Sequence, residues 1–319
     1  MEHPMNNADQ FRVAVIGMGP VGSIISAHLV EAGADVVVCD INRRRIDAIK
    51  ANGIILRNTI EKTIPVAQTS YTISELSEFD LDLIIISVKC SYLKSVLGEI
   101  RQIDSGKVFF MSAQNGIGTE QDIVSHFSKE RTLRMVINFA GNMIDTVEAV
   151  DVTFFNPPNY VSALSTEGRE IEQNFIRLLK SVGLITEPSD DIQIHIWQKA
   201  ILNIALCAPC AILGKTMGEV MSFPPTLKLV ESVLQESIAI AEAEGINLGP
   251  EFPVAAIGYL NKGGPHKPTM LVDVENKLLT EIDYLNGKIV EYGKKHGLAT
   301  PLNYTLTAMV QLLESSYRD

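Results

Sequence analysis

A glycine-rich segment near the start of the chain has the spacing of a phosphate-binding loop. It consists of Gly17, Met18, Gly19, Pro20, Val21 and Gly22, directly after the apolar run Phe11–Ile16. In a G-x-G-x-x-G pattern the first glycine permits a tight turn, the second lets a pyrophosphate approach the backbone, and the third lets a helix pack closely on a strand. The following helix N-terminus adds N–H donors and a positive dipole end. These residues therefore predict a dinucleotide site, and a plain strand–helix turn is the weaker alternative.

An acidic residue stands where the second strand of such a site would end. Asp40 follows Gly22 by 18 residues, the spacing at which a carboxylate accepts hydrogen bonds from ribose hydroxyls. A carboxylate there repels a 2′-phosphate, so it favours NADH over NADPH. The alternative role for Asp40 is an N-cap of the next helix. Arg43, Arg44 and Arg45 follow, and one of them could bind a 2′-phosphate, although a solvated helix face is the simpler interpretation.

A lysine and an asparagine interrupt an apolar segment in the second half. Lys199 and Asn203 are four residues apart, so they share one face of the predicted helix. Reduction of a ketone places negative charge on oxygen, which requires a proton donor and a group that holds the substrate. From the pattern alone, a lysine at the edge of the core with its ammonium in water is an equally good interpretation.

A glutamate in the segment T-E-I-D-Y-L-N-G is a further candidate. We expect a helix over Met270–His296, in which Glu281 falls at the edge of the apolar stripe. On the pattern alone, an exposed pair with Lys277 one turn away is the better interpretation.

Two kinds of element must position these residues. In the first half, short β-branched apolar runs alternate with helical segments, which favours a parallel sheet covered on both faces. The expected strands are Phe11–Ile16, Asp35–Cys39, Leu83–Val88, Val108–Ser112 and Arg134–Asn138, and the expected helices between them are Val21–Ala32, Ile41–Ala51, Tyr92–Ile103 and Thr119–Phe127.

The character of the chain changes toward its middle. Val147–Leu164 is aromatic and alternating and contains prolines, which predicts extra antiparallel strands at the sheet edge, before a helix at Arg169–Val182 and a last strand at Leu184–Glu187. Beyond Pro188 the pattern is almost entirely helical. The expected helices are Ile192–Leu213, Thr226–Glu244, Met270–His296 and Pro301–Ser315.

The predicted organisation is an α/β fold followed by an all-α domain. We expect a disordered lead-in at residues 1–10, a dinucleotide-binding domain with a Rossmann-type doubly wound sheet at 11–189, and a helical catalytic domain at 190–319. The substrate is expected between the two domains, near the carboxyl ends of the strands.

Composition limits the partners and the location. The chain has 319 residues, 46% of them hydrophobic and 20% charged, which excludes intrinsic disorder and suits two domains. Its net charge of −11 disfavours nucleic acid as a partner. We expect no membrane span, because Asn203 and Pro209 interrupt the longest apolar stretch. Sparse cysteines and the lack of a secretory signal pattern indicate the cytoplasm.

The cysteines and histidines do not predict a metal site. Cys207 and Cys210 form a C-x-x-C pair, but a second ligand pair or a thioredoxin-like setting is missing, so two small core residues are the better interpretation. The histidines form no ligand cluster. His266 is close to Thr269 in the sequence and is a candidate for the rim of a substrate pocket.

Several motifs, taken together and in order, resemble the ketopantoate reductase (2-dehydropantoate 2-reductase) family. They are the glycine loop, V-K-C at Lys89, Q-N-G at Asn115, W-Q-K-A-I-L-N, and the blocks T-M-L-V-D-V and T-E-I-D-Y-L-N-G. The resemblance runs from about Arg12 to Leu313. It implies a helical domain of the 6-phosphogluconate-dehydrogenase-like kind and a homodimer.

The resemblance also implies catalytic roles. Lys199 is expected to be the general acid that protonates the developing alkoxide. Glu281 is expected to orient Lys199 and the substrate, and Asn203 to bind the hydroxyl end of the substrate. An ordinary lysine has a pKa of about 10.4, so it is protonated at neutral pH and can donate without prior activation.

The resemblance also implies roles for other positions, and at two of them the sequence departs from the family's pattern. Thr269 stands where the family usually has a serine that contacts the substrate carboxylate, and Lys89 and Asn115 are expected between the nicotinamide ribose and the substrate. Cys207 replaces a second asparagine of the family's K-x-x-x-N-x-x-x-N pattern, which bears on the substrate. Asp40 stands where many members have an arginine for the 2′-phosphate, which bears on the cofactor.

The expected activity is therefore NAD(P)H-dependent reduction of 2-dehydropantoate to (R)-pantoate, a step of pantothenate synthesis in the resembled family. One alternative keeps the chemistry and changes the substrate to another branched 2-oxo acid, with NADH as donor. A second alternative is a non-enzymatic, cofactor-sensing regulator on the same fold. The retained lysine, glutamate and asparagines argue against the regulator.

Overall fold

The computed structural model of the chain describes residues 11–144 and 149–317. The lead-in expected at residues 1–10 lies outside the described residues. The chain divides into two compact units, of which the first comprises the residues up to Val88, Tyr92–Gln114 and Thr119–Ile192. The second comprises Gln193 onward together with two short segments, Lys89–Ser91 and Asn115–Gly118.

The first unit is built on an eight-stranded sheet with the order β12-β11-β8-β7-β6-β1-β2-β5. Its strands are β1 (Arg12–Ile16), β2 (Asp35–Cys39), β5 (Gln68–Ser70), β6 (Leu83–Ile86), β7 (Phe109–Ser112), β8 (Thr132–Val136), β11 (Asn159–Ala163) and β12 (Thr186–Pro188). The run from β5 to β8 is parallel, and β1 lies at the point where the order reverses. The sheet therefore has the doubly wound, dinucleotide-binding topology that the sequence predicts.

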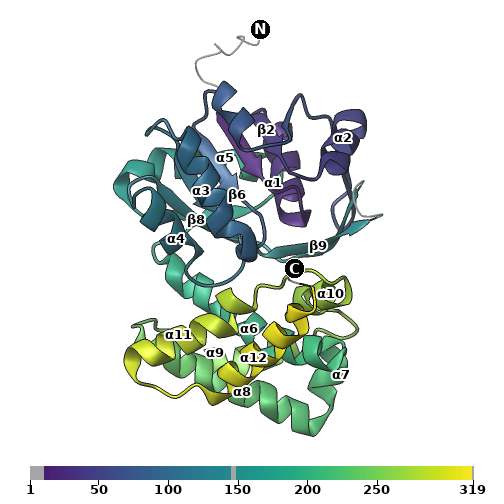
Figure 1. Cartoon of the computed structure of the whole chain (residues 1–319), viewed down its shortest axis with the longest axis vertical. Coiled ribbons are helices and arrows are strands. Elements are labelled where there is room, and N and C mark those ends of the chain that lie inside the picture. Colours follow the sequence, from purple (N-terminus) through teal and green to yellow (C-terminus); the bar gives the residue numbers. More distant parts are fainter. Residues whose placement is uncertain (1–10, 145–148, 318–319) are drawn as a thin grey trace. The chain divides into compact units, whose positions relative to one another are not determined.

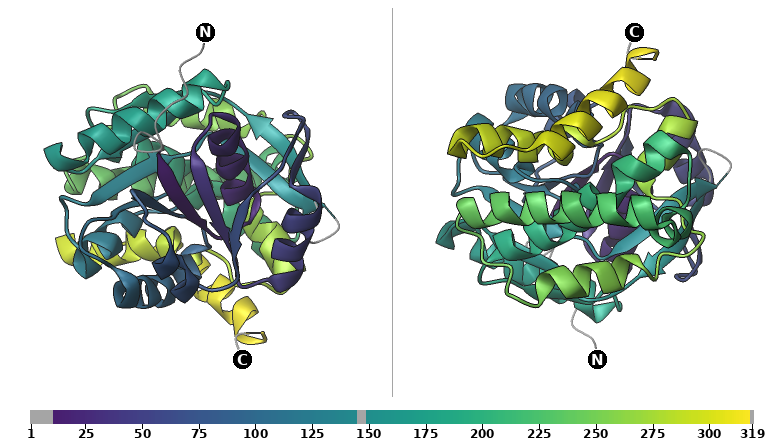
Figure 2. Two further views of the ribbon diagram at one scale, coloured as in Figure 1. Left: turned by 90° about the horizontal axis from the view of Figure 1, so that it is seen from above. Right: turned by 90° about the horizontal axis from the view of Figure 1, so that it is seen from below.

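Helices cover both faces of this sheet (Figures 1 and 2). They are α1 (Pro20–Glu31), α2 (Arg43–Asn52), α3 (Leu93–Ile103), α4 (Thr119–His126) and α5 (Arg169–Ser181), with short 3₁₀ turns at Ser74–Glu78, Cys90–Tyr92 and Thr166–Gly168. Helix α1 packs against α5, and α3 packs against α4. Continuous burial of the strands between these layers explains why they read as unbroken apolar runs.

A second, four-stranded sheet in the first unit was not expected. Its order is β4-β3-β10-β9, formed by β3 (Ile54–Asn58), β4 (Lys62–Ile64), β9 (Phe139–Ile144) and β10 (Ala149–Phe155). All four strands contact α1. Because α1 packs against both sheets, its residues from Gly22 to Leu29 are all buried, which gives a helix without the usual polar face.

The expectation for Val147–Leu164 was therefore half right. Strand β11 does pair antiparallel with β8 in the main sheet. However, β12 lies beyond it, so β11 is not the edge, and β10 belongs to the second sheet, where it pairs parallel with β3. Residues 147 and 148 of the expected segment lie outside the described residues.

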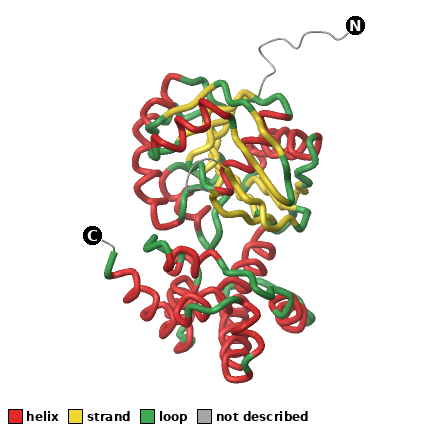
Figure 3. Tube along the Cα trace, turned by 90° about the vertical axis from the view of Figure 1, so that its right-hand side faces the viewer, coloured by secondary structure: helices red, strands yellow, loops and turns green. Residues whose placement is uncertain are grey.

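The second unit is helical, and the strands belong to the first unit (Figure 3). Its helices are α6 (Ile192–Leu213), α7 (Met217–Ser222), α8 (Pro224–Ala243), α9 (Phe252–Leu260), α10 (Thr269–Glu275), α11 (Asn286–His296) and α12 (Pro301–Ser315), with a 3₁₀ turn at Ile282–Tyr284. Helix α8 packs against α7, α9, α11 and α12. Helices α7 and α9 were not among the expected elements.

The helix expected over Met270–His296 is wrong. Helix α10 ends at Glu275, and Lys277 has a positive φ of 55°. Helix α11 starts only at Asn286. The segment between them runs through Thr280, whose side chain is 4% exposed and hydrogen-bonded within the unit, so tertiary contacts replace the helix that the apolar periodicity suggested.

Helix α6 is long and apolar enough to cross a membrane by length and composition alone. This differs from the expectation that Asn203 and Pro209 would exclude such a stretch. However, 67% of its most apolar window is buried inside the protein, as in the core helix of a soluble protein.

Candidate functional site

The glycine loop has the geometry that its three glycines predict. Gly17 has a φ of +96°, and a Cβ there would lie 2.8 Å from the backbone nitrogen of Val88. A Cβ on Gly22 would lie 2.0 Å from the carbonyl oxygen of Gly17. Gly19, by contrast, has no heavy atom within 4 Å of its Cβ position. The first and third glycines are thus required by packing, and the second leaves open space for a ligand beside the backbone.

Asp40 is fixed beside this loop by backbone donors. Its Oδ2 accepts a hydrogen bond of 2.7 Å from the Met18 N–H, and its Oδ1 accepts one of 2.8 Å from the Asn42 N–H. The N-cap of α2 is Asn42, whose side chain accepts a hydrogen bond from the Arg45 N–H. The alternative role of Asp40 as that N-cap is therefore wrong.

The three arginines after Asp40 have different surroundings. Arg45 donates to the Met18 carbonyl at 2.9 Å and lies 3.9 Å from Asp40 Oδ2. The guanidinium of Arg43 lies over the ring of Tyr71, 4.7 Å from its centroid. Arg44 is exposed. Thus Arg45 supports the loop, and Arg43 and Arg44 remain at the surface of α2.

The second unit contains a cluster of charged residues that comes from three parts of the chain. Lys89, in one of the two short segments, forms an ion pair with Asp273 of α10. The N–H of Cys90 donates to Glu281 Oε1 at 3.4 Å. Two residues singled out in the sequence, Lys89 and Glu281, are thereby brought into one cluster.

Asp273 was missed by sequence reasoning. Its side chain is 5% exposed, and burial raises its pKa to about 6, against the opposing effect of Lys89. The negative charges of Glu281 and Glu314 make smaller contributions to this rise. The available signal was its position in the motif T-M-L-V-D-V, four residues after Thr269 and therefore on the same helix face.

Asn115 lies in the other short segment of the second unit. The Cys90 thiol donates to its backbone carbonyl at 2.9 Å. The Ile117 N–H donates to the Tyr284 carbonyl at 2.9 Å, which joins the segment to the turn after Glu281. The side-chain Oδ1 of Asn115 is buried without a hydrogen-bond partner among the described residues. A buried acceptor in this state is suited to a ligand donor.

Helix α6 carries Lys199, Asn203 and Cys207 at intervals of four residues. Lys199 and Asn203 are half-buried, and Cys207 is 8% exposed. Burial strongly raises the pKa of the Cys207 thiol, and Cys210, Glu281 and Asp273 add smaller effects. Cys207 therefore lies near the two carboxylates of the charged cluster as a neutral thiol.

The remaining candidates have simpler surroundings. Thr269 is the first residue of α10, and both its side chain and His266 are exposed. Cys210 is buried, which raises its pKa to about 12, so the C-x-x-C pair has no reactive thiolate. Among residues 11–144 and 149–317, no group of three or more His, Cys, Asp or Glu side chains is placed to hold a metal ion.

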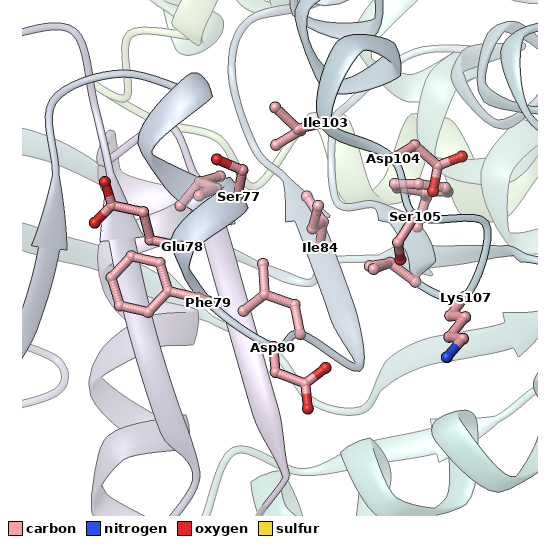
Figure 4. Close-up of a pocket in the computed structure, with 13 residues that line it drawn as sticks. Ser77, Glu78, Phe79, Asp80, Ile84, Ile103, Asp104, Ser105 and Lys107 are labelled. Atoms are coloured by element: carbon pink, nitrogen blue, oxygen red, sulfur yellow. The ribbon is translucent and has the colours of Figure 1, made fainter.

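A surface pocket of about 360 Å³ in the first unit lies away from these residues (Figure 4). It is lined by the segments before β6 and β7, at the amino ends of the strands, and Ile84 and Ile103 form part of its apolar wall. Its Asp80 and Asp104 are ion-paired with Arg12 and Arg131. None of the candidate site residues lines this pocket, so it does not contribute to the site.

A parallel sheet in this strand order, with a glycine loop after β1 and a carboxylate after β2, binds dinucleotides. The first unit therefore has the fold of a dinucleotide-binding domain. The family described as "Ketopantoate reductase PanE/ApbA" matches residues 13–153, and its C-terminal part, "Ketopantoate reductase PanE/ApbA C terminal", matches residues 191–314. The chain belongs to the ketopantoate reductase family.

Full-length relatives agree with this assignment. The 2-dehydropantoate 2-reductase of Aquifex aeolicus is 30% identical over 94% of this chain and 96% of its own length. The enzyme of the same name from Streptococcus pyogenes serotype M3 is 26% identical over 95% of this chain and 98% of its own. These relatives and the family match make the chain an NAD(P)-dependent oxidoreductase that acts on CH–OH groups.

Solved structures include two kinds of neighbour. A PanE/ApbA family ketopantoate reductase from Ralstonia eutropha has a TM-score of 0.86 at 24% identity, covering 97% of this chain and all of its own. D-mandelate dehydrogenase, solved with NADH and anilino(oxo)acetate, has a TM-score of 0.82 at 26% identity over the same shares. The fold thus occurs in enzymes named for different substrates.

Proposed function

We propose that the protein reduces 2-dehydropantoate to (R)-pantoate with NAD(P)H, in the cytoplasm. The observation that carries this proposal is the charged cluster of the second unit. In it Lys89 is paired with Asp273, and Glu281 accepts a hydrogen bond from the N–H of Cys90, the neighbour of Lys89. Lys89 and Glu281 are positions matched from the family motifs, and the motifs do not specify these contacts. The non-enzymatic regulator loses its support, because the family is one of oxidoreductases.

The residues of the first unit fit a dinucleotide. The open side of Gly19 leaves room for a pyrophosphate, and the N-terminus of α1 supplies N–H donors. Asp40 presents a carboxylate to the ribose. When bound, the reduced nicotinamide supplies the hydride that adds to the keto carbon of the substrate.

The residues of the chain handle the proton and the charges. Lys199 donates a proton from Nζ to the carbonyl oxygen of the substrate, which becomes the hydroxyl of the product. Glu281 orients Lys199, and its own carboxylate is held by the Cys90 N–H. The ammonium of Lys89, held by Asp273, supplies a positive charge for an anionic substrate. Asn203 and Thr269 bind the distal hydroxyl and the carboxylate.

NADH is proposed as the better donor. Asp40 places negative charge where a 2′-phosphate would lie, and Arg45, the partly buried arginine nearby, is occupied by Met18 and Asp40. The NADH-bound structure of D-mandelate dehydrogenase, at 26% identity, supports this preference. NADPH, the family's usual cofactor, is the competing donor.

Another branched 2-oxo acid is the second candidate substrate, and Cys207 is the observation that favours it. A thiol replaces an amide at this position, and a thiol is a much weaker hydrogen-bond partner for a substrate hydroxyl. We therefore expect 2-dehydropantoate to be accepted with a reduced advantage over 2-oxoisovalerate.

A homodimer is proposed as the assembly, through the outer face of α12. Tyr304, Met309 and Leu312 on this helix are 62%, 44% and 74% exposed. The one charged residue of Pro301–Ser315 is Glu314, which is buried. In a protein of net charge −11, an uncharged apolar face can meet its own copy across a two-fold axis without like-charge repulsion.

The test of the function is a set of initial rates with NADH and NADPH against a panel of 2-oxo acids, for the wild type and Lys199→Ala. We expect 2-dehydropantoate among the best substrates and a loss of 10²–10⁴-fold in kcat for the variant, the range of general-acid catalysis. Dinucleotide affinity should change little. A variant that retains more than a tenth of wild-type kcat would refute the role of Lys199.

A further inference from the structure

A buried carboxylate on α12 bears on the site described so far only through its effect on the pKa of Asp273. Glu314 is the only charged residue in the sequence of this helix and is 1% exposed. A buried carboxylate is costly unless hydrogen bonds compensate it. Its partners therefore indicate why the helix keeps a charge there.

Two of the hydrogen-bond donors to Glu314 belong to Thr280, the residue that precedes Glu281. Glu314 Oε1 accepts hydrogen bonds from the N–H and the hydroxyl of Thr280, at 2.7 and 2.5 Å. The same Thr280 hydroxyl oxygen accepts a bond of 3.2 Å from the Ile282 N–H. Glu314 thereby fixes the backbone on both sides of Glu281.

The segment needs such an outside support because it lacks regular structure. Glu281 lies between α10 and α11, and its own φ and ψ are −101° and 23°. One turn earlier on α12, Gln311 Nε2 donates to Asp283 Oδ1 at 2.7 Å. Helix α12 thus holds this segment at two points through side chains that the sequence places about 30 residues away.

We infer that Glu314 is a positioning residue, which fixes the backbone of residues 280–282 and so holds the carboxylate of Glu281 in its place in the charged cluster. The inference rests on the proposed function of Glu281. A misplacement of about 1 Å at a catalytic group can lower a rate about 100-fold, so the effect of Glu314 is expected in kcat and much less in dinucleotide affinity.

The first experiment compares Glu314→Gln with Glu314→Met. Glutamine keeps an oxygen that can accept from Thr280, and we expect it to retain kcat within about threefold. Methionine has a similar shape without the acceptor, and we expect a kcat loss of about 10- to 100-fold, with the Kd for NADH within twofold. Equal kcat in the two variants would overturn the inference.

A matched control, at a residue of α8 that also holds α12, separates positioning from general destabilisation. Glu236 of α8 accepts hydrogen bonds from the N–H of Leu302 and from the N–H and side chain of Asn303, at the opposite end of α12. Glu236→Met therefore weakens the attachment of α12 without touching Thr280. Rates are compared at temperatures equally far below each Tm. A kcat loss in Glu236→Met as large as that in Glu314→Met would also overturn the inference.

Two further readouts distinguish failure of this inference from failure of the proposed function. In the Glu281→Gln background, Glu314→Met should cost less than twofold in kcat, because the two residues act in series; additive losses would contradict that. Hydrogen exchange of the Thr280 and Ile282 amides should be faster in Glu314→Met than in Glu314→Gln. This measurement needs no substrate. Unchanged exchange would refute the positioning even if the enzyme reduces a different substrate.

Discussion

The carboxylate of Asp40 is held on both oxygens by backbone N–H groups, so its position does not depend on a bound ligand. We predict that Asp40→Ser raises the ratio of kcat/KM for NADPH over NADH at least tenfold, equivalent to about 1.4 kcal/mol, because a negative charge is removed from the 2′ position. Steady-state rates with both donors measure this ratio.

The control for this prediction is Asp47→Ser, an exposed carboxylate on α2 that accepts a hydrogen bond from Tyr71. It should leave the ratio unchanged. A wild type that prefers NADPH tenfold or more would show that Asp40 does not decide the choice, and Arg43 and Arg44 would become the candidates.

Cys207 is the residue at which the substrate preference can be tested. We predict that Cys207→Asn increases the kcat/KM advantage of 2-dehydropantoate over 2-oxoisovalerate about fivefold to tenfold, since one neutral hydrogen bond is worth about 1 kcal/mol. Cys210→Ser, one turn further along α6, is the control and should leave the ratio unchanged. If Cys207→Asn also leaves it unchanged, the thiol only packs, and Asn203 alone must recognise the hydroxyl.

Asp273 gives the protein a pH dependence of a definite sign. Burial raises its pKa from 3.8 to about 6, so the folded state binds more protons than the unfolded state between these values. Stability from this group is therefore complete below about pH 4 and is lost as the pH rises through 6. We predict that the Tm of the wild type falls relative to that of Asp273→Asn between pH 4 and pH 6.

Thermal unfolding of both proteins at pH 4, 5, 6 and 7 measures this difference, and other titrating groups cancel in the comparison. Asp47→Asn serves as an exposed control and should track the wild type. A Tm difference between the wild type and Asp273→Asn that stays constant over this range would contradict the assignment.

The sequence was sufficient to predict those elements that are either continuously buried strands or long helices. The bounds of Ile192–Leu213 and Pro301–Ser315 were predicted as observed, and the parallel strands β1, β2, β6, β7 and β8 were recognised by their apolar runs. In both cases the apolar pattern of the element alone is enough to predict it, because a strand is buried on both faces and a long helix is buried along one whole face. The parallel strand β5 is short and polar and was missed.

The sequence was insufficient where distant segments decide the structure. Strands β3 and β4 are short and partly exposed, and β3 pairs with β10 about 95 residues later. The break before Glu281 depends on Thr280 and Glu314, which are 34 residues apart. Neither pairing produces a periodic pattern in the local sequence, so neither could be predicted from it. The ion pair of Asp273 with Lys89 also joins distant segments and could not be predicted for the same reason.

The turn after α10 offers a test of backbone strain. Lys277 is exposed and has a φ of 55°, a conformation that glycine adopts more readily. We predict that Lys277→Gly stabilises the protein by about 0.5–1 kcal/mol and raises its Tm by about 2 °C.

Lys294→Gly within α11 is the matched control, because the same substitution in a helix should destabilise by about 1 kcal/mol. Differential scanning calorimetry of the three proteins gives the comparison. A lower Tm for Lys277→Gly than for the wild type would show that the lysine side chain stabilises the turn more than the strain destabilises it.

At the scale of the whole molecule, the outer face of α12 predicts how the protein associates. Leu312→Glu should convert a dimer to monomers, because each copy would bring a buried negative charge to the interface. Sedimentation velocity at about 10 μM measures the mass. Val254→Glu on α9 is the control, since Val254 is equally exposed, at 75% against 74%, but lies on another helix. A wild-type monomer, or a dimer that persists in Leu312→Glu, would contradict this interface.

The two short segments of the second unit, Lys89–Ser91 and Asn115–Gly118, limit how the protein can be recombined or made in pieces. A fragment that starts at Gln193 would bury Asp273 without its lysine and leave the Tyr284 carbonyl without the Ile117 amide. A chimera that exchanges only the C-terminal half between relatives would combine Asp273 and Glu281 of one parent with the two short segments of the other. A unit that is exchanged between relatives must therefore contain the helical half together with the seven residues of these two segments, which are encoded about 100 codons upstream.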